Sequence, residues 1–127
     1  MRNGGRPVLM DYLGHIVQAV ERIDRYTATI DCAAFLASEE KQDAVIRNFE
    51  IIGEASANIG RQYPDFVAKH PAFRWQDAYG MRNVLTHGYF QVDPAVVWQA
   101  MREDLPELKA IVQALLAELA IDDDGEG

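Results

Sequence analysis

Apolar residues recur along most of this chain at intervals of three and four residues, the spacing that places side chains on one face of an α-helix. Near the N-terminus such a stripe follows Pro7, a residue that the first turn of a helix tolerates because its missing N–H would have no partner there. Residues 26–29 (Tyr-Thr-Ala-Thr) break the pattern, since threonine favours caps and turns. The pattern predicts a first helix whose core face is Leu9, Leu13, Ile16, Val20 and Ile23.

A second stripe follows Ser38, whose hydroxyl suits an N-cap, and two glutamates after it suit the positive end of the helix dipole. Gly60 is expected to end this helix. Residues 31–37 should form a short helical turn, whereas residues 61–74, which contain two prolines, are expected to be irregular. The predicted core face of this second helix is Ala44, Val45, Asn48, Phe49, Ile52, Ala55 and Ile59.

The C-terminal half predicts two more helical segments. A shorter one runs from Trp75 through Leu85, and a long one starts at Asp93 and Pro94, an N-cap followed by proline at the first position. Pro106 lies inside the long stripe and should kink or restart the helix. The acidic end of the chain, 122–127, is expected to fray. The long stripe consists of Val97, Met101, Leu105, Leu108, Val112, Leu115 and Leu119.

These segments predict the fold class. Alternating strand patterns bounded by hairpin turns are almost absent, and no internal repeat is seen. A length of 127 residues fits one domain. We therefore expect an all-α, antiparallel up-and-down bundle of four or five helices in a single domain, 1–127, with flexible ends at 1–6 and 121–127. The apolar stripes could serve this core alone or, in part, a dimer interface.

Composition narrows the setting of the protein. A single cysteine, Cys32, excludes an intramolecular disulfide, and no apolar run approaches the length of a membrane span. The basic N-terminus is not followed by the clean apolar region of a signal peptide, because polar residues interrupt the next stretch. We therefore expect a cytoplasmic protein that does not enter a membrane. The net charge of −8 opposes binding to nucleic acid unless positive charge is concentrated locally. Residues 61–91 meet that condition modestly, with four basic residues against two acids.

The segment 81–89 places three chemically capable side chains within a few residues of one another. Arg82 can bind a phosphate with two N–H groups, His87 suits proton transfer near neutral pH, and Tyr89 can hold a phosphate oxygen. In an ideal helix Arg82 and Tyr89 share a face, but His87 would point about 140° away from Arg82. Either the helix loosens before His87, or a second copy of the chain completes the site. On spacing alone, such a set of residues near a helix end is usually a surface cluster or a satisfied hydrogen-bond network, and catalysis is the less common explanation.

The sequence resembles the HEPN domains, in their HepT-like branch. Residues 82–89 match the R-x4-H-x-Y pattern of that family, and residues 43–55, DAVIRNFEIIGEA, resemble its second signature. Trp75, Trp98 and the residues that lead into Arg82 also look typical, so the similarity covers roughly residues 9–115.

The resemblance implies an all-α homodimer in which two R-x4-H-x-Y segments meet and form a ribonuclease site that needs no metal or other cofactor. It implies catalytic roles for Arg82, His87 and Tyr89. Relatives of this type act as toxins and pair with an MNT-type nucleotidyltransferase antitoxin, which can add AMP to the motif tyrosine, here Tyr89. RNA is the implied substrate.

Four further residues have two open interpretations. Arg47, Glu50 and Glu54 lie in the second signature at i,i+3 and i,i+4 spacings and share one helix face. They could be a solvated salt-bridge face or could line a cleft beside Arg82. Asn83 could bind phosphate or cap the local backbone.

Three functions remain open from the sequence. The leading hypothesis is a ribonuclease toxin in which the RNA 2′-hydroxyl attacks the adjacent phosphate, His87 transfers a proton and Arg82 neutralises the developing charge. The alternatives are a non-catalytic subunit that presents Tyr89 or a nucleotide pocket to a transferase partner, and a purely structural helical dimer.

Overall fold

A computed structural model of the chain describes residues 6–71 and 93–126. These residues form six helices and, within the described ranges, no strand. The helices are α1 (Arg6–Thr27), α2 (Cys32–Leu36), α3 (Glu39–Gln62), α4 (Pro64–Lys69), α6 (Pro94–Glu103) and α7 (Leu105–Glu126). The predicted all-α class is confirmed, and the arrangement agrees with a HEPN-like bundle. Helix α7 is helical as far as Glu126, four residues past the point at which fraying was expected.

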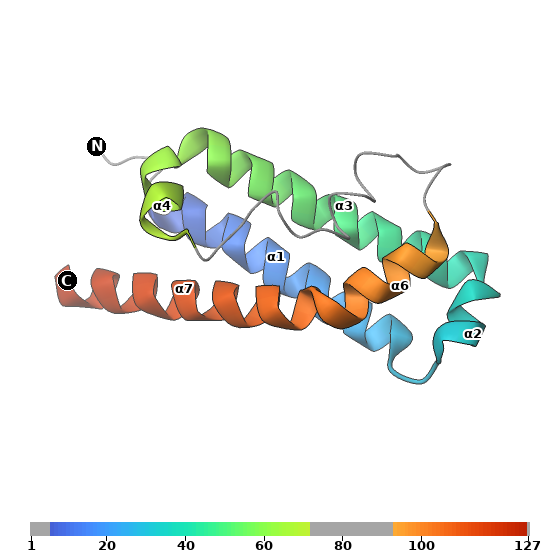
Figure 1. Cartoon of the computed structure of the whole chain (residues 1–127). Coiled ribbons are helices and arrows are strands. Elements are labelled where there is room, and N and C mark those ends of the chain that lie inside the picture. The colour runs from blue at the N-terminus through green and yellow to red at the C-terminus, as the bar shows by residue number, and fades with distance from the viewer. Residues whose placement is uncertain (1–5, 72–92, 127) are drawn as a thin grey trace.

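Helix α1 is the centre of the described bundle, with α3 packed on one side of it and α7 on the other (Figure 1). The chain runs along α1 toward the end where α2 lies, and both α3 and α7 run back in the opposite direction. Helix α4 lies at the end of the bundle where α3 finishes, and α6 lies toward the other end, against α2. The long helices are therefore antiparallel to α1, as an up-and-down arrangement requires.

The predicted apolar stripes form the core. Every residue of the first and last stripes is buried, and six of the seven positions expected on the second stripe are buried as well. Ala44 is the exception, since it is only half-buried. The largest fully buried side chains include Phe35, Phe49, Leu13 and Ile52. Trp98, which belongs to α6, packs its ring 5.3 Å from that of Phe35 and thereby joins α6 to α2.

The two predicted N-caps, Ser38 and Asp93, are present, and the structure adds a third at Asp31. The side chains of Asp31, Ser38 and Asp93 accept hydrogen bonds from the backbone N–H groups of residues 34, 41 and 95, at 2.9, 3.1 and 2.9 Å. Each bond satisfies one of the N–H groups that the first turn of a helix leaves without a partner. The predicted restart near Pro106 is also confirmed, because α6 ends at Glu103 and α7 begins at Leu105.

Two sequence predictions about the end of α3 are wrong. Gly60 does not end this helix, which continues to Gln62 and closes with a bond of 2.8 Å from the N–H of Tyr63 to the carbonyl of Ile59. A glycine inside a helix costs only about 1 kcal/mol, and the buried side chain of Ile59 holds the last turn in place. Residues 61–74 are not irregular throughout, because Pro64 starts α4 from the position where proline costs no hydrogen bond.

No helix in the described part of the chain combines the length and the apolar character that a membrane crossing requires.

Candidate functional site

The four residues expected to carry or support the chemistry within the motif, Arg82, Asn83, His87 and Tyr89, lie outside the described residues. The described chain stops at residue 71, just after α4, and resumes at residue 93, just before α6. The mutual geometry of the three motif side chains therefore stays a prediction from the sequence. The remaining candidates, Arg47, Glu50 and Glu54, lie in the described part of the chain.

Arg47, Glu50 and Glu54 lie on the solvent side of α3. An Nη1 atom of Arg47 is 3.7 Å from Oε1 of Glu50, and 69% of the Arg47 side chain and 44% of the Glu50 side chain are exposed. Glu54, one turn further along the helix, is also exposed. The three residues share a face, as their spacing predicts. An exposed pair of this length contributes little to stability, so the guanidinium and the carboxylates remain accessible to a ligand.

A polar contact that the sequence analysis did not find joins α1 to α3. Asn48 is only 4% exposed, among apolar neighbours of the core. Its Oδ1 atom accepts a hydrogen bond of 3.0 Å from Nη1 of Arg22, and its Nδ2 atom donates one of 2.9 Å to the carbonyl of Ala44. The one available signal was an amide on an otherwise apolar helix face, because a buried amide needs partners.

His70 ends α4 and joins it to α7. Its Nδ1 atom is 2.9 Å from the carbonyl oxygen of Phe66, and its Nε2 atom is 3.3 Å from Oε1 of Glu118. A carbonyl can only accept, so Nδ1 donates to Phe66, and a second proton on Nε2 would let the ring donate to Glu118 as well. The sequence alone does not indicate this contact, because Glu118 is 48 residues away from His70 in the chain.

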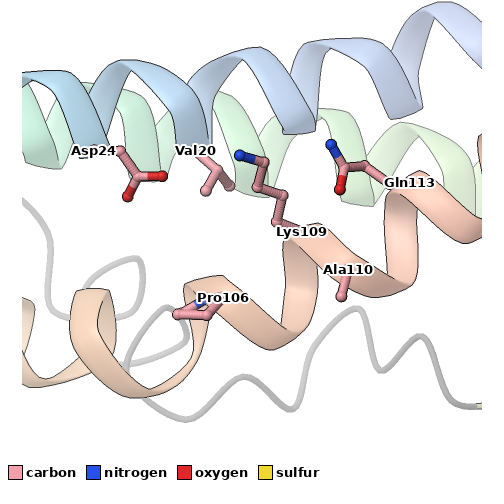
Figure 2. Close-up of a pocket in the computed structure, with 6 residues that line it drawn as sticks. All are labelled: Val20, Asp24, Pro106, Lys109, Ala110 and Gln113. Carbon is pink, nitrogen blue, oxygen red and sulfur yellow. The ribbon is translucent and has the colours of Figure 1, made fainter.

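A pocket of about 330 Å³ lies between α1 and the first half of α7 (Figure 2). The ammonium group of Lys109 extends from α7 toward α1 in this pocket. Its Nζ atom is 3.7 Å from Oε2 of Glu21. Arg47, Glu50 and Glu54 do not line this pocket. The described residues that line it are Val20, Asp24, Pro106, Lys109, Ala110 and Gln113.

At the end of α3, an amide and two tyrosines lie close together. Nε2 of Gln62 donates to the hydroxyl of Tyr12 at 3.1 Å. Burial, and to a smaller degree the nearby Tyr12, raises the pKa of Tyr63 above its usual value. Among the described side chains, no three of the histidine, cysteine and acidic residues gather closely enough to hold a metal ion.

Comparison with known proteins identifies the family. Residues 16–115 match the model of the family described as Ribonuclease HepT-like. A protein of Thermococcus cleftensis named as a probable ribonuclease HepT is 44% identical over 105 residues, which is 83% of this chain and 93% of that protein. The span matched by the family model, residues 16–115, includes both signatures.

Two proteins of Methanocaldococcus jannaschii are also similar. One, a putative RNase, is 36% identical over 80% of this chain and 91% of its own length. The other, a gamma-glutamylcyclotransferase and putative RNase, is 36% identical over 85% of this chain, but the match spans only 47% of that protein. No solved structure matches the chain significantly.

Proposed function

Since this chain belongs to the HepT-like ribonuclease family, we propose that it is a metal-independent endoribonuclease whose catalytic residues are Arg82, His87 and Tyr89. The observation that supports this proposal most is the R-x4-H-x-Y motif, which stands inside the matched span of residues 16–115 without a departure at any of its three positions. The relatives named as ribonucleases match across most of this chain.

The chemistry follows from the three side chains. The 2′-hydroxyl oxygen of the RNA attacks the adjacent phosphorus, and the bond from phosphorus to the 5′ oxygen of the next nucleotide breaks. His87 takes the proton of the 2′-hydroxyl or gives one to the leaving 5′ oxygen. Arg82 neutralises the charge that develops on the phosphorane, and Tyr89 holds a phosphate oxygen. The products are a 2′,3′-cyclic phosphate and a 5′-hydroxyl.

We propose further that the enzyme works as a homodimer. An ideal helix would hold Arg82 and His87 about 140° apart, so one segment alone does not bring both onto one phosphate. A second copy, with its own motif facing the first, would supply the missing group. Asn83, Arg47, Glu50 and Glu54 are proposed as supporting residues near this cleft. The exposure of the Arg47 and Glu50 side chains on α3 leaves them free for such a role.

The proposed biological role is that of a cytoplasmic toxin held in check by an MNT-type nucleotidyltransferase antitoxin. The partner would transfer AMP to Tyr89: the phenolic oxygen attacks the α-phosphorus of ATP, and pyrophosphate leaves. The modified tyrosine carries bulk and negative charge, which would exclude the RNA backbone from the site. If the chain proves not to cleave RNA, presentation of Tyr89 to such a partner becomes the leading function.

Induced expression in a bacterial host tests the ribonuclease function. We expect the wild-type chain to arrest growth and fragment cellular RNA, and we expect His87→Ala to do neither at equal protein level. His15→Ala is the matched control, because His15 is an exposed histidine on α1 outside the motif. Intact RNA and normal growth with the wild-type chain would contradict the proposal. Toxicity in both histidine variants would contradict the assigned role of His87.

A further inference from the structure

The contact between Arg22 and Asn48 holds the guanidinium in place but uses only one of its N–H donors. Asn48 is held in one orientation, because its Nδ2 atom donates to the carbonyl of Ala44 and leaves Oδ1 to face Arg22. The side chain of Arg22 is only partly exposed and is bound at one of its terminal nitrogens. A guanidinium has five N–H donors. Most of the donors of Arg22 therefore remain available to a ligand, while the hydrogen bond to Asn48 fixes the position of the side chain.

Within the described part of the chain, no ion pair gives Arg22 an opposite charge. Among the described residues, the ion pairs join Arg47 to Glu50, His70 to Glu118 and Lys109 to Glu21, and none includes Arg22. Asn48 satisfies one N–H group but offers no negative charge. A partly buried cation has lost part of its hydration, and a neutral hydrogen-bond acceptor compensates only some of that free-energy cost. A bound anion would offset the rest. In a chain with 20 acidic residues, a carboxylate at position 48 would have offset that cost.

Two more arginines lie near this contact in the chain. Arg25 is exposed and follows Arg22 by three residues, so it lies on the same side of α1. Arg47 directly precedes Asn48 on α3, and its side chain is 69% exposed with one long contact to Glu50. Arg25 therefore adds an exposed positive charge on the side of α1 that carries Arg22. Arginine suits a phosphate ligand, because the guanidinium fork matches phosphate oxygens.

We infer that Arg22, fixed by Asn48, binds a backbone phosphate of single-stranded RNA at the seam between α1 and α3. This inference rests on the ribonuclease function proposed above and assigns RNA-binding residues outside the R-x4-H-x-Y motif. Arg22 positions the strand and takes no part in the proton transfers. The contact is independent of base identity, since the phosphate carries no sequence information.

RNA binding as a function of salt tests this assignment. The full chain with His87→Ala, which should not cleave, is titrated against a fluorescein-labelled single-stranded RNA over a range of KCl concentrations. Adding Arg22→Gln should reduce the slope of log K against log salt by about 0.7, the value for one phosphate contact, and lower affinity about fivefold at about 0.1 M salt. Adding Lys109→Gln instead removes the same charge from the α1–α7 side and should leave the slope unchanged.

A second variant keeps the test decisive if Arg22→Gln does not fold. Asn48→Asp keeps the size of the side chain and places a carboxylate against Arg22, so it should weaken RNA binding and lower the slope although Arg22 is retained. If the His87→Ala parent and whichever of these two variants folds show equal slopes of log K against log salt, the inference is overturned. A lower melting temperature with an unchanged slope would also overturn it, because Arg22 would then be a structural cross-link.

Two other results separate the possible failures. If Arg22→Gln changes the oligomeric state in sedimentation but not the slope, Arg22 contacts protein, and the inference is overturned. If the His87→Ala parent binds no RNA at all, the ribonuclease function fails, and the inference fails with it. If the parent binds RNA normally and Arg22→Gln changes neither the affinity nor the slope, only the inference about Arg22 is overturned.

Discussion

Helix α1 makes two seams of different character, one with α3 and one with α7. At the α3 seam, Arg22 meets a buried amide that carries no charge. At the α7 seam, Glu21 meets Lys109, and each charge has an opposite partner at 3.7 Å at the edge of an open pocket. The comparison teaches that the number of polar contacts across a seam does not reveal its role. The α7 seam is neutralised internally, whereas the α3 seam keeps a fixed positive charge for a ligand.

The apolar cores of the two seams also differ, and truncation should show it. Phe49→Ala removes a fully buried aromatic ring from α3 and should lower the free energy of unfolding by about 3–5 kcal/mol. Leu115→Ala, which truncates a side chain of α7 that is 6% exposed, should cost less, about 2–3 kcal/mol. Urea unfolding measures both values. A larger loss for Leu115→Ala would show that α7, not α3, is the main support of α1.

The buried amide should matter more for stability than the exposed ion pair. Asn48→Ala removes two hydrogen bonds and leaves Arg22 without its acceptor, so we expect a loss of about 1–3 kcal/mol. The measurement is again urea unfolding, with Asn58→Ala as the matched control, because Asn58 lies on the same helix but is not buried. A loss no larger than that of the control would show that the contact is not fixed in solution.

The ion pair of the α7 seam should contribute little. The side chains of Lys109 and Glu21 are 29% and 45% exposed, and pairs of this kind are worth about 0–1 kcal/mol. Lys109→Gln and Glu21→Gln should each change the free energy of unfolding by an amount within that range. The change relative to the wild-type chain should become smaller as the salt concentration is raised. A double-mutant cycle in low and high salt measures it. A coupling that persists in high salt would contradict a solvent-screened pair.

The smallest effect is expected on the outer face of α3. Arg47→Ala should change the free energy of unfolding by less than about 0.5 kcal/mol, because the side chain is largely exposed and its contact to Glu50 is long. RNA cleavage by the same variant should nevertheless fall if Arg47 supports the cleft. Unchanged cleavage in a stable Arg47→Ala protein would assign the face to solvent and remove Arg47, Glu50 and Glu54 from the site.

The sequence predicted those parts of the fold that depend on local rules. The helical stripes and the caps at Ser38 and Asp93 follow from spacing and side-chain chemistry, and the structure confirms them. The end of α3 was mistaken because helix-ending residues were given more weight than tertiary packing: the buried Ile59 carries the helix through Gly60.

The polar contacts between helices could not be predicted in the same way. Asn48 was correctly placed on the buried face, but its partner Arg22 lies 26 residues away, and the stripe of one helix does not tell which polar residue of another will meet it. The same holds for His70 and Glu118. The roles of Arg82, Asn83, His87 and Tyr89 come from the family motif and stay predictions.

The most direct test of the central claim is the chemistry of the RNA ends produced by the purified chain in the presence of EDTA. We predict cleavage that leaves 2′,3′-cyclic phosphate and 5′-hydroxyl ends, is lost in His87→Ala and is retained in His15→Ala. Cleavage that requires a divalent metal, leaves 3′-hydroxyl ends or persists in His87→Ala would contradict a metal-independent ribonuclease built on Arg82, His87 and Tyr89.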